Sequence, residues 1–264
     1  MATNNGIKSK DRVQAHGEVF TPDSIVMDMI KLVDDELMKE PEVEALSEEG
    51  KLWYYIDSTV LEPTCGDGQF LIRLLYKKLE AVSKLPVEQR ELAALHAVCS
   101  IYGVDIQEDN VVEARERMYN IFIGNEVETF DNKEPRTFSI SFKDLGIDIS
   151  EKLKKAVKFV LEANIIVGNT LIANGRDSYD KNAAPDKRPV FFNKWEFSGT
   201  KVRAVYDYLY DGAPVQLKDG EEVSKDVDFL DIDTIWDGYI NPIEKKNASG
   251  SYEEQESDED VWDF

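Results

Sequence analysis

The chain has 264 residues and a net charge of −22, from 31 basic and 53 acidic side chains. This length is enough for one α/β domain with additions, and the acidity argues against a free-standing binder of duplex DNA, because phosphate binding needs a basic face. Two cysteines, two histidines and no C-x-x-C pattern argue against a disulfide framework and predict no metal site. We expect a soluble, cytoplasmic protein, since the sequence shows no signal peptide or long apolar run.

The start of the chain predicts a flexible segment followed by a helix. Residues 1–16 are polar, and Phe20-Thr21-Pro22 comes soon after them. Thr21 can cap a helix and Pro22 suits its first turn. The helix that follows repeats apolar residues along one face, at Ile25, Met29, Val33 and Leu37. The acidic residues 40–53 predict a loop or a short helix.

The most informative stretch runs from Leu61 to Phe70 and reads Leu-Glu-Pro-Thr-Cys-Gly-Asp-Gly-Gln-Phe. Leucines at helical spacing follow it, which predicts a strand, a tight glycine turn and a helix. Gly66 and Gly68 lack a Cβ, so a ligand can approach the backbone closely. Glu62 lies at the end of the strand, where an open α/β sheet binds ligands, and its carboxylate suits a cationic group such as an ammonium. The β-prone residues ahead of the turn are Tyr54, Tyr55, Ile56, Val60 and Leu61.

A second buried strand is predicted over residues 98–106, and Asp105 and Ile106 end it. Asp109 or Asn110 then opens a helix. An acid at the tip of such a strand can hold both hydroxyls of a ribose. An ordinary strand-end aspartate without this function is the alternative.

The next segments continue the alternation of strands and helices. Residues 124–136 are polar and turn-rich, and residues 137–142 alternate like a strand, with Asp144 just beyond it. A helix capped by Ser150 leads into a buried strand that ends before Asn169. Strands that alternate with helices in this way predict a parallel sheet.

These segments together resemble the S-adenosylmethionine (SAM)-dependent methyltransferases. They are most similar to the adenine-N6 DNA methyltransferases, which include the modification subunits of type I restriction systems. The stretch from Glu62 to Phe70 looks like motif I, Phe20-Thr21-Pro22 like motif X, Asp105-Ile106 like motif II, and Asp144 like motif III. A nicotinamide-dinucleotide fold is the alternative, but its third glycine is missing, because Phe70 and Leu71 occupy that region.

The resemblance implies an α/β fold of the Rossmann-like class I methyltransferase type, a mostly parallel sheet flanked by helices, over residues 17–210. SAM is the implied cofactor. Its implied binding residues are Phe20, Thr21, Pro22, Glu62, Pro63, Cys65, Gly66, Gly68, Phe70, Asp105, Ile106 and Asp144. In this family the motif X segment lies against the methionine end of SAM. Asp105 would hold the ribose, Ile106 would pack on the adenine, and Asp144 would accept from the adenine amine.

The catalytic motif of the family, Asn/Asp-Pro-Pro-Tyr/Phe, is reduced here to Asn169-Thr170-Leu171-Ile172. In that motif the asparagine oxygen orients the target amine, the prolines fix the backbone, and the aromatic residue stacks on a flipped base. Asn169 is therefore the one catalytic residue that the resemblance implies. Either the fold is kept and catalysis is lost, or the site is rebuilt with an aromatic residue from elsewhere. The candidates for that residue are Tyr179, Phe191, Phe192 and Trp195.

The C-terminal third is increasingly acidic. Residues 173–189 predict a locally basic loop, which could contact phosphate or simply be solvated. Residues 190–210 and 227–240 suggest further strands. Residues 211–250 predict an acidic extension that packs on the domain, and residues 251–264, with seven acids and no base, predict a disordered acidic tail. This tail ends in a phenylalanine and resembles the tips of single-stranded DNA-binding proteins, which dock partners; a solubilising tail is the alternative.

The sequence therefore predicts a SAM-dependent methyltransferase-like protein that acts on nucleic acid, by adenine-N6 DNA methylation or as a degenerate relative of such enzymes. No large target-recognition domain fits in the chain, so we expect a partner protein to supply recognition. The alternative function is a catalytically inactive interaction subunit, or an acidic DNA mimic, that binds a DNA-handling protein. A small restriction-modification-like protein of this kind would suit a phage. Methylation of a protein or a small molecule also stays open.

Overall fold

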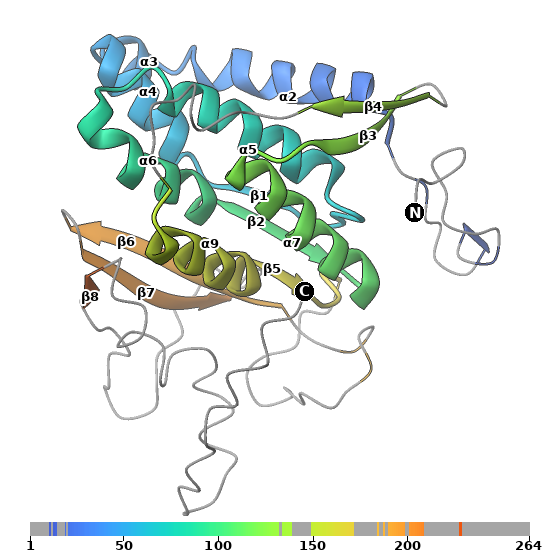
Figure 1. Cartoon of the computed structure of the whole chain (residues 1–264). Coiled ribbons are helices and arrows are strands. Elements are labelled where there is room, and N and C mark those ends of the chain that lie inside the picture. The colour runs from blue at the N-terminus through green and yellow to red at the C-terminus, as the bar shows by residue number, and fades with distance from the viewer. Residues whose placement is uncertain are drawn as a thin grey trace, which may run out of the picture.

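A small parallel sheet lies at the centre of this computed structural model (Figure 1). The structure describes residues 11, 13–14, 19, 21–131, 134–138, 149–171, 184, 187, 190–198, 201–208 and 227–228. In these ranges the helices are α2 (Asp23–Leu37), α3 (Pro41–Glu44), α4 (Glu48–Asp57), α5 (Gln69–Val82), α6 (Val87–Cys99), α7 (Glu108–Ile123) and α9 (Glu151–Asn164). The strands are β1 (Val60–Glu62), β2 (Ile101–Asp105), β3 (Val127–Asp131), β4 (Glu134–Phe138), β5 (Ile165–Val167), β6 (Phe191–Ser198), β7 (Lys201–Tyr208) and β8 (Val227–Asp228).

The parallel sheet contains β1, β2 and β5, in that order. Leu61 lies opposite Tyr102, and Gly103 lies opposite Ile165. A parallel sheet combined with helices confirms the α/β class. In the Rossmann order the first strand lies between the second and the fourth, whereas here β2 is central and β1 is at one edge of the described sheet. The carboxyl end of β2 therefore lies between those of its two neighbours.

The two faces of this sheet are covered by different layers. Side chains of a strand alternate between faces, and Gly103 faces the helices, because a Cβ there would meet Leu71 of α5 at 2.8 Å. The opposite face carries Tyr102 and Val104, which pack with Phe192 of β6. Figure 1 shows the antiparallel strands β6 and β7, in orange, on the lower side of the parallel sheet and α5 on its upper side. Helices and an antiparallel sheet thus sandwich the parallel strands.

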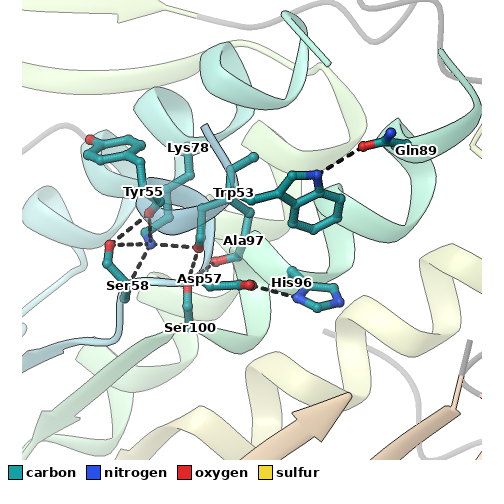
Figure 2. A network of polar contacts seen from close by, with 10 residues as sticks. Trp53, Tyr55, Asp57, Ser58, Lys78, Gln89, His96, Ala97 and Ser100 are labelled. Atoms are coloured by element: carbon teal, nitrogen blue, oxygen red, sulfur yellow. Dashed lines mark hydrogen bonds and ion pairs between the residues drawn. The ribbon is translucent and has the colours of Figure 1, made fainter. Parts of the chain in front are cut away.

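The end of α4 is held by polar side chains from its neighbours (Figure 2). Lys78 of α5 is 1% exposed, and its Nζ donates to the backbone oxygens of Tyr55, Ile56 and Ser58 at 2.9, 2.8 and 2.7 Å. Ser100 adds a hydrogen bond from its Oγ to the Ile56 oxygen at 2.9 Å. The last carbonyls of a helix have no partner within the helix, so these contacts supply the missing donors.

Three local predictions were wrong. Tyr54 to Ile56 belong to α4 and not to a strand, because Ser47 caps the start of this helix and Lys78 caps its end. Residues 124–136 contain β3 and the start of β4, not only turns. Strand β4 starts at Glu134 and pairs antiparallel with β3, so it is outside the parallel sheet. Polar residues make this hairpin hard to recognise in the sequence, since the exposed Glu128 lies between the buried Val127 and Thr129.

Helix α2 buries a different face from the one that its apolar repeat suggested. Val26 and Ile30 are 0% and 3% exposed, whereas Ile25, Met29 and Val33 are 48%, 51% and 61% exposed. Asp23 and Asp34 lie on the buried side and form ion pairs with Arg73 and Lys77 of α5. These pairs set the rotation of α2 about its axis. No helix in the described part of the chain is long and apolar enough to cross a membrane.

Two matched substitutions test this orientation of α2. We expect Ile30→Ala to lower the free energy of unfolding by about 2–5 kcal/mol, because it leaves a cavity in the core. Ile25→Ala, on the exposed face of the same helix, should change it by less than about 0.5 kcal/mol. Helix propensity cancels in the comparison, since both variants replace isoleucine by alanine. Urea unfolding measures both values, and equal costs would show that α2 does not bury the Ile30 face.

Candidate functional site

The predicted strand, glycine turn and helix are confirmed. Strand β1 ends at Glu62, and α5 starts at Gln69 with Gly68 as its N-cap residue. Gly66 and Gly68 have φ values of 54° and 87°, in the left-handed region that favours glycine. The turn closes on itself through a hydrogen bond from Gly68 N to the Cys65 oxygen at 2.9 Å. Cys65 N in turn donates to the Val104 oxygen at 2.8 Å, which ties the turn to β2.

Asp105, at the end of the central strand, connects the ends of all three parallel strands. Its Oδ2 accepts from the backbone N of Gly66 at 2.9 Å. Its Oδ1 accepts from the backbone N of Gln107 at 2.8 Å and from the Asn110 side chain at 3.2 Å. Its backbone oxygen accepts from Gly168 N, after β5, at 3.0 Å. Asp105 therefore contacts the segments that follow all three strands. Its carboxylate binds the glycine turn and the start of α7, and its backbone oxygen binds the segment after β5.

Contacts also join the outer strand ends. Glu62 is half-buried, and its Oε1 accepts from the backbone N and the Oγ1 of Thr64, both at 3.3 Å. The Oγ1 of Thr170 donates to the Pro63 oxygen at 3.4 Å, across a sequence separation of 107 residues. Because β2 lies between these two strands, the segment after β5 reaches across the end of the sheet to the segment after β1.

Asn169 adopts a local hydrogen bond that the sequence did not predict. Its Oδ1 accepts from the backbone N of Leu171 at 2.9 Å, which closes an Asx-turn. Leu171 itself is 88% exposed. The turn restrains the backbone that prolines would otherwise fix, but it occupies the oxygen that would orient a target amine.

Burial raises the pKa of the Cys65 thiol well above its usual value, and the nearby carboxylates of Asp105 and Glu62 act in the same direction. Cys65 therefore stays protonated at neutral pH and does not supply a thiolate nucleophile. In the ranges that the structure describes, no group of three or more His, Cys, Asp and Glu side chains could hold a metal ion.

No protein family, curated protein or solved structure matches this chain. The function is therefore inferred from the residues of the site and their geometry.

The structure brings together most of the predicted cofactor-binding residues. They lie at the carboxyl ends of the parallel strands or in the segments that follow: Glu62, Pro63, Cys65, Gly66, Gly68, Asp105 and Ile106. The predicted catalytic residue, Asn169, follows β5 at the same end of the sheet. Phe70 is half-buried and packs against the helical core. Phe20 and Asp144 lie outside the described residues, as do Tyr179 and the tail over residues 251–264.

The Thr21-Pro22 segment starts α2, but not as predicted. The N-cap residue is Pro22, and no side chain caps the helix, so Thr21 is not the cap. The Pro22 oxygen accepts from the backbone N of Ile25 and Val26 at 3.0 and 3.1 Å. Asp23 follows directly and forms an ion pair with Arg73 on α5, the helix that the glycine turn opens. This ion pair ties the start of α2 to the first turns of α5.

Two of the aromatic residues considered for stacking on a base have other partners. Phe192 is 7% exposed and packs against Tyr102 on the lower face of the parallel sheet. Trp195 donates from its Nε1 to Asn164 Oδ1 at 2.8 Å. Phe192 thus packs on the lower face, and Trp195 binds the last residue of α9, directly before β5, so these contacts do not support either residue as the base-stacking partner of Asn169.

Sequence reasoning missed two residues of α7 that contact the glycine turn. A Cβ on Gly68 would lie 2.9 Å from the Cβ of Ala114. Arg117 donates to the Asp67 oxygen at 2.7 Å. These contacts join residues that are 46 and 50 positions apart, and no local pattern in the sequence marks them.

The close contact between Gly68 and Ala114 can be tested by placing a methyl group at position 68. Gly68→Ala should lower the free energy of unfolding by about 2–4 kcal/mol, because it combines an overpacked contact with an unfavourable positive φ. Thermal unfolding measures this loss. Adding Ala114→Gly should recover the part of the packing cost that comes from the Ala114 Cβ, and it should leave the part from the Cα of residue 114, 3.0 Å away, and the cost of the positive φ. If the second substitution recovers nothing beyond its own cost, contact with Ala114 is not what requires a glycine here.

Proposed function

We propose that this chain is a SAM-binding α/β protein of the methyltransferase type that acts on nucleic acid, although the order of its described parallel strands departs from the Rossmann order. The observation that carries the proposal is the Asp105 carboxylate. It lies at the end of the central strand and holds the glycine turn through Gly66 N; Glu62 ends one neighbouring strand, and Asn169 follows the other. A glycine turn beside a strand-end acid suits a nucleoside ligand in an open α/β sheet.

Each residue then has a chemical task. The Asp105 carboxylate accepts ribose hydroxyls, and Ile106 packs on the adenine. A carboxylate offers about four lone-pair sites, and the longest of its three present side-chain hydrogen bonds, from Asn110 at 3.2 Å, is the one that a hydroxyl would replace. Glu62 would attract the ammonium group of SAM, and the Thr21-Pro22 segment would help to hold its methionine end. When bound, SAM supplies the methyl group.

The proposed acceptor is the N6 amine of adenine in DNA. Asn169, after β5, would accept a hydrogen of that amine and direct its lone pair to the methyl group. The net charge of −22 means that a basic partner protein supplies much of the attraction for phosphate. This is the arrangement of a restriction-modification subunit, or of a phage relative of one.

One observation favours a second candidate, a non-catalytic interaction subunit or acidic DNA mimic. Asn169 Oδ1 accepts from Leu171 N, so the oxygen that would orient the amine is engaged within its own loop. The prolines that would prevent this contact are absent. A protein of this kind would bind a DNA-handling partner through its negative charge.

Titration calorimetry with SAM tests the first candidate. We expect the wild-type protein to bind SAM and Asp105→Asn to bind it at least about tenfold more weakly, because hydrogen bonds to a charged group are worth about 1.5–3 kcal/mol. Asp28→Asn, at an exposed position on α2, is the matched control and should bind normally. Transfer of labelled methyl from SAM to unmodified duplex DNA then separates the candidates. A folded protein that binds no SAM would contradict the proposal.

A further inference from the structure

Arg117 of α7 connects three separate segments around the glycine turn. Its NH1 donates to the backbone oxygen of Asp67 at 2.7 Å and lies 2.9 Å from Asp67 Oδ2. Its NH2 donates to Gln69 Oε1 and to the backbone oxygen of Glu128 in β3, both at 2.7 Å. One guanidinium therefore contacts the middle of the turn, the first residue of α5 and the β3–β4 hairpin.

The pair of Asp67 and Arg117 is shielded from solvent, with side-chain exposures of 9% and 12%. A buried ion pair of this kind adds little net stability, because both ions lose their hydration. Such a pair can instead select one conformation. The turn needs this selection, since Asp67 lies between two glycines with many accessible backbone conformations.

The turn is held from two sides by one continuous segment of the chain. Asp105, at the end of β2, binds the backbone N of Gly66. Arg117, on the helix that follows β2, binds Asp67, and Ala114 of the same helix lies against Gly68. The segment from β2 to α7 thus contacts each of the three residues of the turn.

We propose that Arg117 is a positioning residue for the cofactor-binding turn. It holds both the backbone and the carboxylate of Asp67, which fixes the Gly66–Gly68 turn in the shape that the cofactor meets. In this role Arg117 would hold the turn and would not need to contact the cofactor itself. Through Glu128 it also couples the shape of the turn to the position of the β3–β4 hairpin. The proposal rests on the proposed SAM site, but the holding of the turn can be measured without SAM.

Arg115 provides a matched control on the same helix. Its Nε donates to the Ile165 oxygen at 2.8 Å, and its NH2 donates to the Glu162 oxygen at 3.1 Å. Arg115 therefore binds the end of α9 and the start of β5 through the same kind of contact as Arg117, in which a guanidinium donates to backbone carbonyl oxygens. It contacts no residue of the glycine turn in these hydrogen bonds. Loss of Arg115 reports the general cost of losing a half-buried arginine from α7.

The experiment compares Arg117→Met, Arg117→Lys and Arg115→Met by amide hydrogen exchange and by SAM titration. We expect Arg117→Met to speed exchange of the backbone over residues 65–69 by about tenfold or more, since the turn samples other conformations. It should weaken SAM binding by at least about tenfold through lost preorganisation. Arg117→Lys should restore only part of the protection from exchange and of the SAM affinity, because one ammonium group cannot make all the hydrogen bonds of the planar guanidinium. Arg115→Met should lower thermal stability but leave exchange of the turn and SAM affinity within about twofold of wild type.

Two results would overturn the positioning role. One is unchanged exchange over residues 65–69 in Arg117→Met. The other is an equal change in Arg115→Met, which would mean that any loss from α7 loosens the turn. A wild-type protein that binds no SAM would overturn the proposed function instead, while the exchange data would still decide whether Arg117 holds the turn.

Discussion

Replacement of Lys78 by methionine is expected to lower the free energy of unfolding by about 3–5 kcal/mol. The Lys78 side chain is 1% exposed, and its Nζ donates to the backbone oxygens of Tyr55, Ile56 and Ser58 (Figure 2). Methionine fills a similar volume but donates no hydrogen bond. The Ser58 oxygen would lose its hydrogen bond from Lys78, and the Tyr55 and Ile56 oxygens would keep only those from Ser58 Oγ and Ser100 Oγ, directly ahead of β1 and the glycine turn. Urea unfolding measures the loss.

The neighbouring residue supplies the control. Lys77 forms an ion pair with Asp34 of α2, with side-chain exposures of 22% and 18%. Solvent screens this pair partly, so Lys77→Met should cost no more than about 1 kcal/mol. Equal losses for the two lysines would contradict the role of Lys78 as the cap of α4.

The pH dependence gives a second readout of Lys78. Burial lowers the pKa of Lys78 to about 7, although Asp57 and Asp34 act in the opposite direction. In the unfolded chain the pKa of a lysine is about 10.4. Between these values the unfolded state binds more protons, so the proton-linked part of the stability contributed by Lys78 is complete above the unfolded pKa and is lost as pH falls to about 7, while the part from its hydrogen bonds remains. The difference in free energy of unfolding between wild type and Lys78→Met should therefore widen as pH rises from 7 to about 10.

The glycine turn and Asp105 could be predicted because their signals are local. β-Prone residues, two close glycines and a helical repeat lie within about 20 residues of one another, and the order of these signals defines a strand, a turn and a helix. The buried strand before Asp105 is equally local. These two stretches contain most of the candidate site, which is why the positions of Glu62, Gly66 and Asp105 at neighbouring strand ends could be anticipated.

The contacts that decide details of the fold join distant residues, and the sequence does not mark them. Tyr55 and Ile56 have β-prone side chains, yet they are helical because Lys78, more than 20 positions later, caps their carbonyls. Helix α2 has two possible apolar faces, and ion pairs such as that of Asp23 with Arg73 select between them. Arg117 reaches Asp67 in the same way. Local periodicity in the sequence cannot predict these three features, because each depends on a contact with a residue that is distant in the sequence and close only in the folded protein.

Leu171→Pro is expected to increase methyl transfer from SAM to duplex DNA by about 100-fold, if the chain is the enzyme proposed above. In the present loop Leu171 N donates to Asn169 Oδ1 at 2.9 Å. Proline has no N–H, so the substitution releases this oxygen while the ring restrains the backbone. The released oxygen can then accept a hydrogen of the adenine amine. The cost in stability should be small, because Leu171 is 88% exposed.

Leu171→Ala is the matched control, since it removes the same side chain but keeps the N–H that binds Asn169. Labelled methyl transfer should rise only in the proline variant, and it should disappear when Asn169→Ala is added. A rise in both single variants would mean that the exposed leucine, and not the engaged oxygen, limits the reaction. If the proline variant is folded, binds SAM and still transfers no methyl group, the hydrogen bond that engages Asn169 Oδ1 is not the reason for the inactivity. The non-catalytic interaction subunit would then be the better description, because the SAM site would be kept without a competent acceptor site beside it.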